Sequence, residues 1–197
     1  MIEGYILASD LDNFIFIKGI NKLLDFLVGQ FFIYTSFGGI NMAIEKVREY
    51  FKNLGIVDRI REFEVSSATV ELAACALSCE PKRIAKTLSF KVEEDVVLIV
   101  TAGDAKIDNP KFKAKFATKA KMLTPDEAEE LVGHAVGGVC PFAVNDGVKV
   151  YLDESLKRFT TVFPACGSSN SAIELTIEEL EKYSGYLEWV DVCKNWQ

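Results

Sequence analysis

The sequence predicts a single domain of the mixed α/β (α+β) class, in which a curled mixed sheet is flanked by helices. The length of 197 residues is enough for one domain with a sizeable core. Hydrophobic residues make up 49% of the chain and charged residues 26%, as in ordinary globular proteins. Helical and strand-like segments are interspersed along the chain, without internal repeats or low-complexity tracts.

The composition changes at Met42. Residues 1–41 contain eight of the 22 aromatic residues and only two basic residues, Lys18 and Lys22. Their apolar stretch, residues 23–37, is too short and too polar to span a membrane, and the chain start lacks the pattern of a secretory signal peptide. We interpret residues 1–41 as a leader from a misassigned start, with Met42 beginning the folded unit. A real amphipathic or strand-forming extension is the alternative.

The first element of the domain is predicted to be a helix that starts near residue 42. Four apolar residues share one helical face at a 3-4-3 spacing, and Gly55 follows as a C-terminal cap. A second helix is predicted over residues 69–77, and Pro81 prevents its continuation. The apolar residues of the first helix are Ile44, Val47, Phe51 and Leu54.

A β-hairpin is predicted after the second helix. Residues 86–92 and 96–101 are rich in β-forming residues and are joined by a polar turn, residues 93–95. A pair of strands needs more sheet to be stable, so further strands are expected later in the chain.

Two capping boxes mark further helix starts. Thr124 and Thr176 are each followed three residues later by Glu, and Gly133 ends the first of these helices. Short strands complete the predicted sheet. They are expected at residues 135–144, 148–152, 160–165, 172–175 and 187–192.

Charge and cysteine usage exclude several classes of protein. The formal net charge of −7 argues against a broadly basic nucleic-acid-binding surface. The five cysteines are an odd number without a C-x-x-C pair, and the chain has one His, so we expect neither a disulfide framework nor a metal site. The chain also lacks a G-x-S-x-G elbow, a P-loop and a dinucleotide fingerprint. We therefore expect no cofactor and a reducing, cytoplasmic location.

The first candidate site is the glycine pair Gly137-Gly138. Paired glycines let the backbone approach a ligand and point N–H groups one way, as a developing oxyanion requires. A tight turn or bulge between two strands is the alternative. His134 lies six residues before Cys140, so an extended segment would separate them by about 20 Å. A Cys–His nucleophilic pair would form only if the glycine turn folded them together.

The second candidate is Lys86, which stands beside Thr87 at the head of the predicted hairpin. A lysine in a largely apolar strand needs a partner or an anion such as a phosphate, because a buried ammonium is costly. The alternative is an edge-strand lysine that limits aggregation.

The third candidate is a basic stretch over residues 106–121, which has Asp108 as its one acidic residue. Such a local excess of positive charge fits a surface that follows a sugar–phosphate backbone, and a solvated helix face is the alternative. Phe112 and Phe116 are expected to anchor this helix to the core. The six basic residues are Lys106, Lys111, Lys113, Lys115, Lys119 and Lys121.

Five ordered motifs resemble the YbaK family, the prolyl-tRNA-synthetase-associated (ProX-like) editing domains, which hydrolyse mischarged aminoacyl-tRNA. They are I-x-K-T-L at 84–88, V-T-A-G-D at 100–104, A-V-G-G-V-C-P-F at 135–142, V-Y-L-D at 150–153 and G-S-S-N-S-A-I-E-L at 167–175. The resemblance covers residues 42–193 and implies one editing domain there, with a barrel-like mixed sheet flanked by helices.

The resemblance also implies roles for individual residues. It implies that Lys86, Gly137 and Gly138 are catalytic, although Cys140 departs from the family, which often has Ser there. The residues expected to bind substrate are Thr87, Val139, Cys140 and Asp153. The residues expected to bind tRNA, on the charge of the basic stretch and not on the resemblance, are Lys106, Lys111, Lys113 and Lys115.

The implied activity is that of a cytoplasmic, trans-acting deacylase, which hydrolyses the ester of tRNA for proline carrying a wrong small amino acid. Its partners would be the acceptor end of aminoacyl-tRNA and prolyl-tRNA synthetase, with no membrane and no DNA. An aminoacyl ester is already activated, so a placed water and oxyanion donors suffice without a triad. The alternatives are a non-catalytic module that binds tRNA or an amino acid, and a thiol enzyme that uses Cys140.

Overall fold

The computed structural model describes residues 42–196, so the expected leader, residues 1–41, lies outside the described residues. The helices are a first helix at residues 42–53, η1 (Val57–Arg59), α2 (Val70–Leu77), η2 (Pro81–Arg83), α3 (Asn109–Phe116), α4 (Pro125–Glu127), η3 (Ala128–Val132), η4 (Glu154–Arg158) and α5 (Ile177–Ser184). The strands are β1 (Arg61–Glu62), β2 (Ile84–Val92), β3 (Asp95–Ala102), β4 (Lys106–Ile107), β5 (Lys149–Asp153), β6 (Thr161–Pro164), β7 (Ser171–Ala172), β8 (Leu175–Thr176), β9 (Glu188–Val190) and β10 (Cys193–Lys194).

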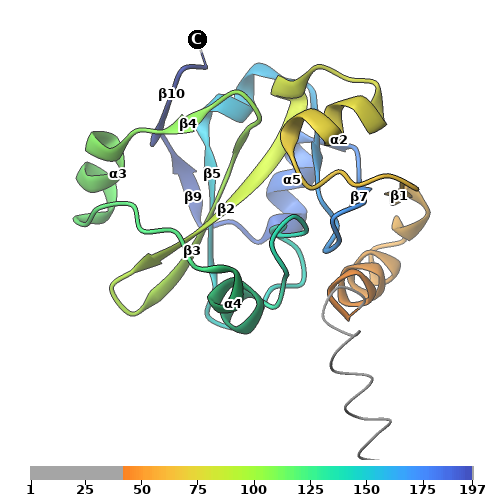
Figure 1. The fold of residues 1–197 in the computed structure, drawn as a ribbon, viewed down its shortest axis with the longest axis horizontal. Coiled ribbons are helices and arrows are strands. Elements are labelled where there is room, and N and C mark those ends of the chain that lie inside the picture. Colours follow the sequence, from red (N-terminus) through yellow and green to blue (C-terminus); the bar gives the residue numbers. More distant parts are fainter. Residues whose placement is uncertain (1–41, 197) are drawn as a thin grey trace, which may run out of the picture. The chain divides into compact units, whose positions relative to one another are not determined.

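The fold is of mixed α/β class, as predicted, and its main sheet curls into a half-barrel flanked by helices (Figure 1). The order of the six strands in this sheet is β8-β6-β2-β3-β5-β9. The pairs β2–β6, β3–β5 and β5–β9 are parallel, whereas β2–β3 and β6–β8 are antiparallel. Two small antiparallel pairs, β1–β7 and β4–β10, join segments that are far apart in the sequence.

The predicted hairpin is confirmed as the centre of this sheet. β2 and β3 pair antiparallel from Ala85 to Val92, with Lys86 opposite Thr101 and Val92 opposite Asp95. The turn between them places Glu93 in the left-handed region, with a φ of 55°. The hairpin gains the further sheet that it needs from β6 on one side and β5 on the other.

The predicted helix caps are also confirmed. Thr69, which was predicted as the first residue of a helix over 69–77, lies just before α2 and caps it by accepting a hydrogen bond from the Leu72 amide. Thr124 and Thr176 form complete capping boxes at the starts of α4 and α5. Gly133 ends the α4–η3 helix in a left-handed conformation, as expected. Local side-chain chemistry therefore fixes where these helices begin and end.

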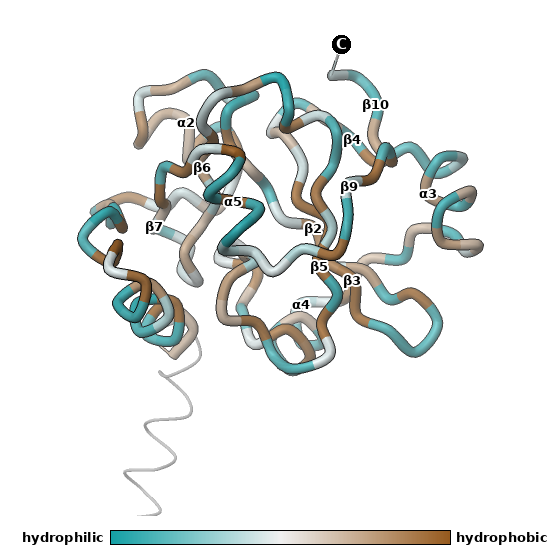
Figure 2. Tube along the Cα trace, turned by 180° about the vertical axis from the view of Figure 1, so that it is seen from behind, coloured by the Kyte–Doolittle hydropathy of each residue, from teal (hydrophilic) through white to brown (hydrophobic). Residues whose placement is uncertain are grey.

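One core joins the sheet to its helices. Val97 to Ala102 of β3 are buried without exception, and Figure 2 shows the hydrophobic residues gathered along β2, β3 and β5. Phe112 of α3 packs on Phe90 with ring centroids 5.0 Å apart, and Phe116 packs on Tyr151 at 5.3 Å. The prediction that both phenylalanines anchor this helix to the core is confirmed.

The prediction of a strand over residues 135–144 is wrong. These residues form consecutive turns, in which Gly137 has a φ of +92° and Gly138 donates a backbone hydrogen bond to Ala135. The apolar side chains that suggested a strand hold this loop in the core, since Cys140 and Phe142 are fully buried. A second difference is small: the strand expected at 172–175 is divided between β7 and β8.

Within residues 42–196 there is no helix of sufficient length and apolar character to cross a membrane.

Candidate active site

A pocket of about 360 Å³ lies beside β2, between helix α2 and the turn that contains Gly137. β2 contributes Lys86 and Thr87 to its lining, and the turn contributes Val136, Gly137 and Val139. Four of the sequence-predicted residues therefore meet at one pocket, and Lys86 carries the single charged side chain among its described lining residues. Most of the other lining is apolar and includes Val70, Ala73, Ile84, Leu88, Leu123 and Phe163.

Lys86 is held by backbone carbonyl groups. Its half-buried Nζ donates hydrogen bonds to the carbonyl oxygens of Gly103 (2.9 Å) and Ala105. Burial lowers the pKa of this ammonium from the usual lysine value. An ammonium has three N–H donors, so one remains beyond the two carbonyls. The alternative of an edge-strand lysine is wrong, because β2 lies between β6 and β3.

The glycine turn presents backbone N–H groups beside this lysine's pocket. Gly137 needs its left-handed φ of +92°, which a residue with a side chain rarely adopts. Among the described residues, the amides of Gly137 and Val139 have no hydrogen-bond acceptor, whereas the Gly138 and Cys140 amides are bonded. The two unbonded amides belong to residues that line the pocket. They are therefore the candidates for binding an oxyanion.

Gly138 has a packing role in this loop and does not line the main pocket. It borders a small hollow of about 20 Å³ that also contains Gly167 and Ser168. A Cβ at Gly138 would lie 2.8 Å from both the Gly167 carbonyl carbon and the Ser168 nitrogen. The glycine at this position thus lets the turn lie directly against the 167–171 loop.

Thr87 lines the pocket, but its hydroxyl oxygen is buried and is not exposed to the pocket space. Thr87 Oγ1 has no hydrogen-bond partner within the described part of the chain. A buried polar group without a partner is costly, and such groups in native proteins call for an explanation.

The structure brings His134 and Cys140 together, but outside the pocket. The glycine turn folds back so that Cys140 Sγ lies 3.7 Å from His134 Nδ1, and both side chains are fully buried. Burial lowers the pKa of His134 to about 4 and raises the pKa of Cys140 to about 12. Both groups are therefore neutral at physiological pH. A reactive cysteine requires an accessible thiolate, so this pair does not support the thiol-enzyme alternative.

The structure places Asp153 away from the pocket lining. Its carboxylate is fully buried at the end of β5 and accepts hydrogen bonds from the amides of Ser155 and Val192, each at 3.0 Å. Both carboxylate oxygens are thus occupied by the protein backbone. Asp153 has no direct contact with the pocket that would let it bind substrate as the resemblance implied.

The four lysines expected to bind tRNA fall into two groups. Lys111 pairs with Asp191 at 2.7 Å, and Lys115 pairs with Glu188 at 2.7 Å. Their charge is largely compensated by acidic residues from the C-terminal part of the chain. Lys106 and Lys113 are exposed and have no ion pair among the described residues.

Sequence reasoning missed most of the pocket wall. The loop of residues 66–69 is held against residues 167–171, with the Ser67 amide donating to the Ser169 carbonyl at 2.6 Å. Ala68 and Ser171, from these two segments, line the pocket. The motif at 167–175 had been noted as a family motif, but its sequence alone gave no indication of this role.

Comparisons with known proteins now add to this geometry. The family model described as "Aminoacyl-tRNA editing domain" matches residues 64–183, which is more than half of the chain and includes Lys86 and the glycine turn. The chain belongs to the aminoacyl-tRNA editing domain family. The match lies within the range of residues 42–193 that the resemblance covers.

Relatives of this editing domain include whole proteins and parts of larger ones. It is 55% identical over 157 residues to the "Uncharacterized protein YwhH" of Bacillus subtilis (strain 168), covering 79% of this chain and 100% of YwhH. It is 25% identical over 155 residues to the "Proline--tRNA ligase" of Geobacillus sp. (strain WCH70), covering 71% of this chain. The matched region spans only 27% of that ligase.

Solved structures share the fold of the editing domain. A crystal structure described as "a putative trans-editing enzyme for prolyl tRNA synthetase" has a TM-score of 0.70 and 28% identity, covering 77% of this chain and 97% of its own. The "hypothetical protein APE2540" has a TM-score of 0.68 and 27% identity, covering 76% of this chain and 99% of its own.

Proposed function

We propose that this editing domain is a trans-acting deacylase that hydrolyses the ester of mischarged aminoacyl-tRNA. The substrate proposed is tRNA for proline that carries a wrong small amino acid, and prolyl-tRNA synthetase is the proposed partner. The observation that carries the proposal is the convergence of Lys86 and Gly137 on one pocket. The match to the editing-domain family and the similarity to proline–tRNA ligases support it.

The chemistry proposed for the pocket needs no nucleophilic side chain. The third N–H of Lys86 binds a phosphate or ribose oxygen of the tRNA acceptor end and so orients the ester. The amides of Gly137 and Val139 stabilise the oxyanion that forms when water adds to the ester carbonyl.

The size and polarity of the pocket support a small, uncharged amino acid. The volume of about 360 Å³ must hold the aminoacyl group together with part of the terminal nucleotide, which leaves little room for a long side chain. An apolar wall discriminates by only ~1–3 kcal/mol per methylene, which is the reason that editing by a second site is useful.

A basic strip beside the pocket offers a path for the tRNA backbone. Lys91 and Lys121 lie on adjacent extended segments, joined by a hydrogen bond from the Lys91 amide to the Lys121 carbonyl (2.9 Å). Met122, which follows Lys121, lines the pocket and is 56% exposed. Because like charges opposite each other on paired strands are destabilising, the pairing of Lys91 with Lys121 favours a site that binds an anion. The neighbouring Glu127 caps its own helix. The hydrogen bonds of that cap and, to a lesser degree, the charges of Lys121 and Lys91 lower the pKa of its carboxylate.

We propose that phosphates of the acceptor stem bind this strip, together with Lys106 and Lys113. Lys111 and Lys115, which are already paired with carboxylates, contribute less. The test measures tRNA affinity against salt concentration. Lys91→Glu/Lys121→Glu should weaken binding and flatten its salt dependence, because fewer counterions are released. An unchanged salt slope would contradict this path.

The main test is deacylation of a panel of mischarged tRNAs. We expect the wild-type protein to release a small amino acid from tRNA for proline, and Lys86→Ala to reduce the rate on the order of 100-fold. Lys52→Ala is the matched control, because this lysine is exposed on the first helix and should leave the rate unchanged. Equal rates for Lys86→Ala and wild type would refute the proposal. Salt-sensitive binding of tRNA without hydrolysis would favour the non-catalytic module.

A further inference from the structure

The backbone turn of residues 102–105, which we call the carbonyl turn, determines where the Lys86 ammonium lies. Two of the three N–H donors of Lys86 bind the carbonyl oxygens of Gly103 and Ala105. The residue between these two carbonyls is Asp104, whose negative charge acts on the Lys86 ammonium. Lys86 therefore binds the carbonyl groups on either side of Asp104 but forms no ion pair with the Asp104 carboxylate itself.

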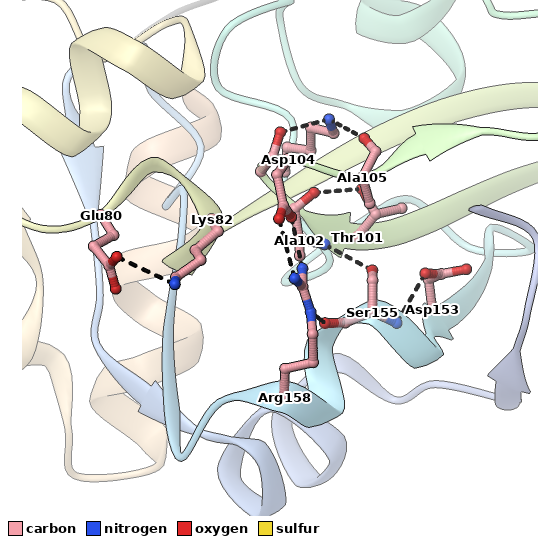
Figure 3. Close-up of polar contacts among 11 residues, drawn as sticks. Glu80, Lys82, Thr101, Ala102, Asp104, Ala105, Asp153, Ser155 and Arg158 are labelled. Carbon is pink, nitrogen blue, oxygen red and sulfur yellow. Dashed lines mark hydrogen bonds and ion pairs between the residues drawn. The ribbon is translucent and has the colours of Figure 1, made fainter. Parts of the chain in front are cut away.

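The Asp104 carboxylate forms an ion pair with Arg158. Arg158 Nη1 lies 3.0 Å from Asp104 Oδ2, and Nη2 lies 2.6 Å from Asp104 Oδ1, so the pair is bidentate. Figure 3 shows the Arg158 side chain rising from η4 to meet Asp104 at the carbonyl turn. Arg158 Nε also donates to the Ser155 carbonyl at 2.9 Å, which fixes the guanidinium in its own helix.

A second set of contacts ties η4 to the start of the same turn. The Ala102 amide donates to Ser155 Oγ at 3.1 Å, and the Ser155 amide donates to Asp153 Oδ1 (Figure 3). Asp153 Oδ2 accepts from the Val192 amide. The buried carboxylate of Asp153 thus orients Ser155, and Ser155 holds Ala102. This accounts for Asp153 without any contact between its carboxylate and a substrate.

We propose that Arg158 is a positioning residue, which keeps Asp104 from capturing Lys86 and so leaves the third N–H of Lys86 directed into the pocket. This inference rests on the proposed function of Lys86. An ammonium beside a free carboxylate forms a charge-assisted hydrogen bond in preference to one with a neutral carbonyl. Without Arg158, the Asp104 carboxylate would draw Lys86 Nζ out of the pocket.

The Arg158–Asp104 pair also contributes to folding stability, so the two effects must be measured separately. Its side chains are 26% and 33% exposed, and a bidentate, partly buried pair contributes more than an ordinary surface ion pair. Urea denaturation of Arg158→Ala measures the loss of stability, and its rate is compared with wild type under conditions where both proteins are folded.

The test is a double-mutant comparison of deacylation rates. If capture by Asp104 holds about nine-tenths of the Lys86 ammonium, Arg158→Ala lowers kcat/KM about 10-fold. Arg158→Ala combined with Asp104→Asn should recover most of the rate, because the competing carboxylate is gone. A double variant as impaired as Arg158→Ala, or an Arg158→Ala variant with the wild-type rate, would overturn the proposal.

Two further measurements keep the result interpretable. Arg59→Ala is the matched control, since it removes a bidentate pair with Glu179 of similar geometry that lies outside the pocket lining, and it should leave kcat/KM unchanged. The pKa of Lys86, read by NMR titration of its side chain, should rise in Arg158→Ala and fall again in the double variant. A Lys86 pKa that stays constant would overturn the proposal even if wild type deacylates nothing, whereas absence of wild-type deacylation alone refutes only the proposed function.

Discussion

Acidification should weaken the fold through His134, the one histidine of the chain. His134 is fully buried, and its Nδ1 accepts a hydrogen bond from the Cys140 amide at 3.3 Å, at the end of the glycine turn. Burial lowers its pKa to about 4, whereas an unfolded histidine titrates at about 6.5. Between these values the unfolded chain binds a proton that the folded chain does not. Stability therefore falls as the pH falls through this window.

The size of the effect follows from the two pKa values. Lowering the pH from 7.5 to 5 should reduce the free energy of unfolding by about 2 kcal/mol, if the unfolded pKa is about 6.5 and the folded pKa about 4. Most carboxylates remain ionised over this range, so they add little to the change. Urea denaturation at a series of pH values measures it directly.

The variant His134→Asn is the control, because its side-chain oxygen can still accept the Cys140 amide but it has no titration in this range. Its stability should be nearly constant between pH 7.5 and 5. Equal pH dependence in this variant and in the wild type would refute the assignment of the effect to His134. A wild-type stability that is flat over the same range would refute it as well.

Three further predictions concern the pocket and its surroundings. Gly137→Ala should lower stability by about 1–2 kcal/mol in urea denaturation and reduce the deacylation rate, since it forces a side chain into a left-handed turn 3.0 Å from the Ala68 Cβ. Thr87→Val should keep or raise the free energy of unfolding in urea denaturation, because it removes an unpartnered buried hydroxyl. Cys140 should resist alkylation at pH 8 in the folded protein, as followed by peptide mass spectrometry, while the exposed Cys75 reacts. Rapid alkylation of Cys140 with loss of activity would restore the thiol-enzyme alternative.

The elements that the sequence predicted well are those with local causes. The β2–β3 hairpin has its own polar turn, and the helix starts at Thr124 and Thr176 have side chains that bond their own first turns. The strand predicted at residues 135–144 was wrong because their apolar side chains pack a buried loop into the core, and a run of apolar residues does not distinguish such a loop from a strand. The left-handed φ at Gly137 decides the backbone there.

Site residues were predictable where the residue type is unusual for its local sequence, and not where their state depends on side chains that are distant in the sequence. Lys86 and Gly137 were identified from residue types that are unusual in their setting. In contrast, the carboxylates that neutralise Lys111 and Lys115 come from Asp191 and Glu188, whose proximity only the fold creates. The approach of His134 to Cys140 likewise depends on how the glycine turn closes.

The position of the hairpin within the sheet has a consequence for how the molecule assembles and opens. Among residues 42–196, β2–β3 is the one long strand pair whose partners are adjacent in sequence, whereas β2–β6, β3–β5 and β5–β9 must close long intervals of chain. The hairpin is also the centre of the sheet, and residues 97–102 are buried, so its amide hydrogens should exchange slowly with solvent and those of residues 135–139 much faster. Lys86 would then lie in a slowly exchanging part of the protein. The amides of Gly137 and Val139 lie on a faster-exchanging segment, and a ligand bound in the pocket would slow their exchange.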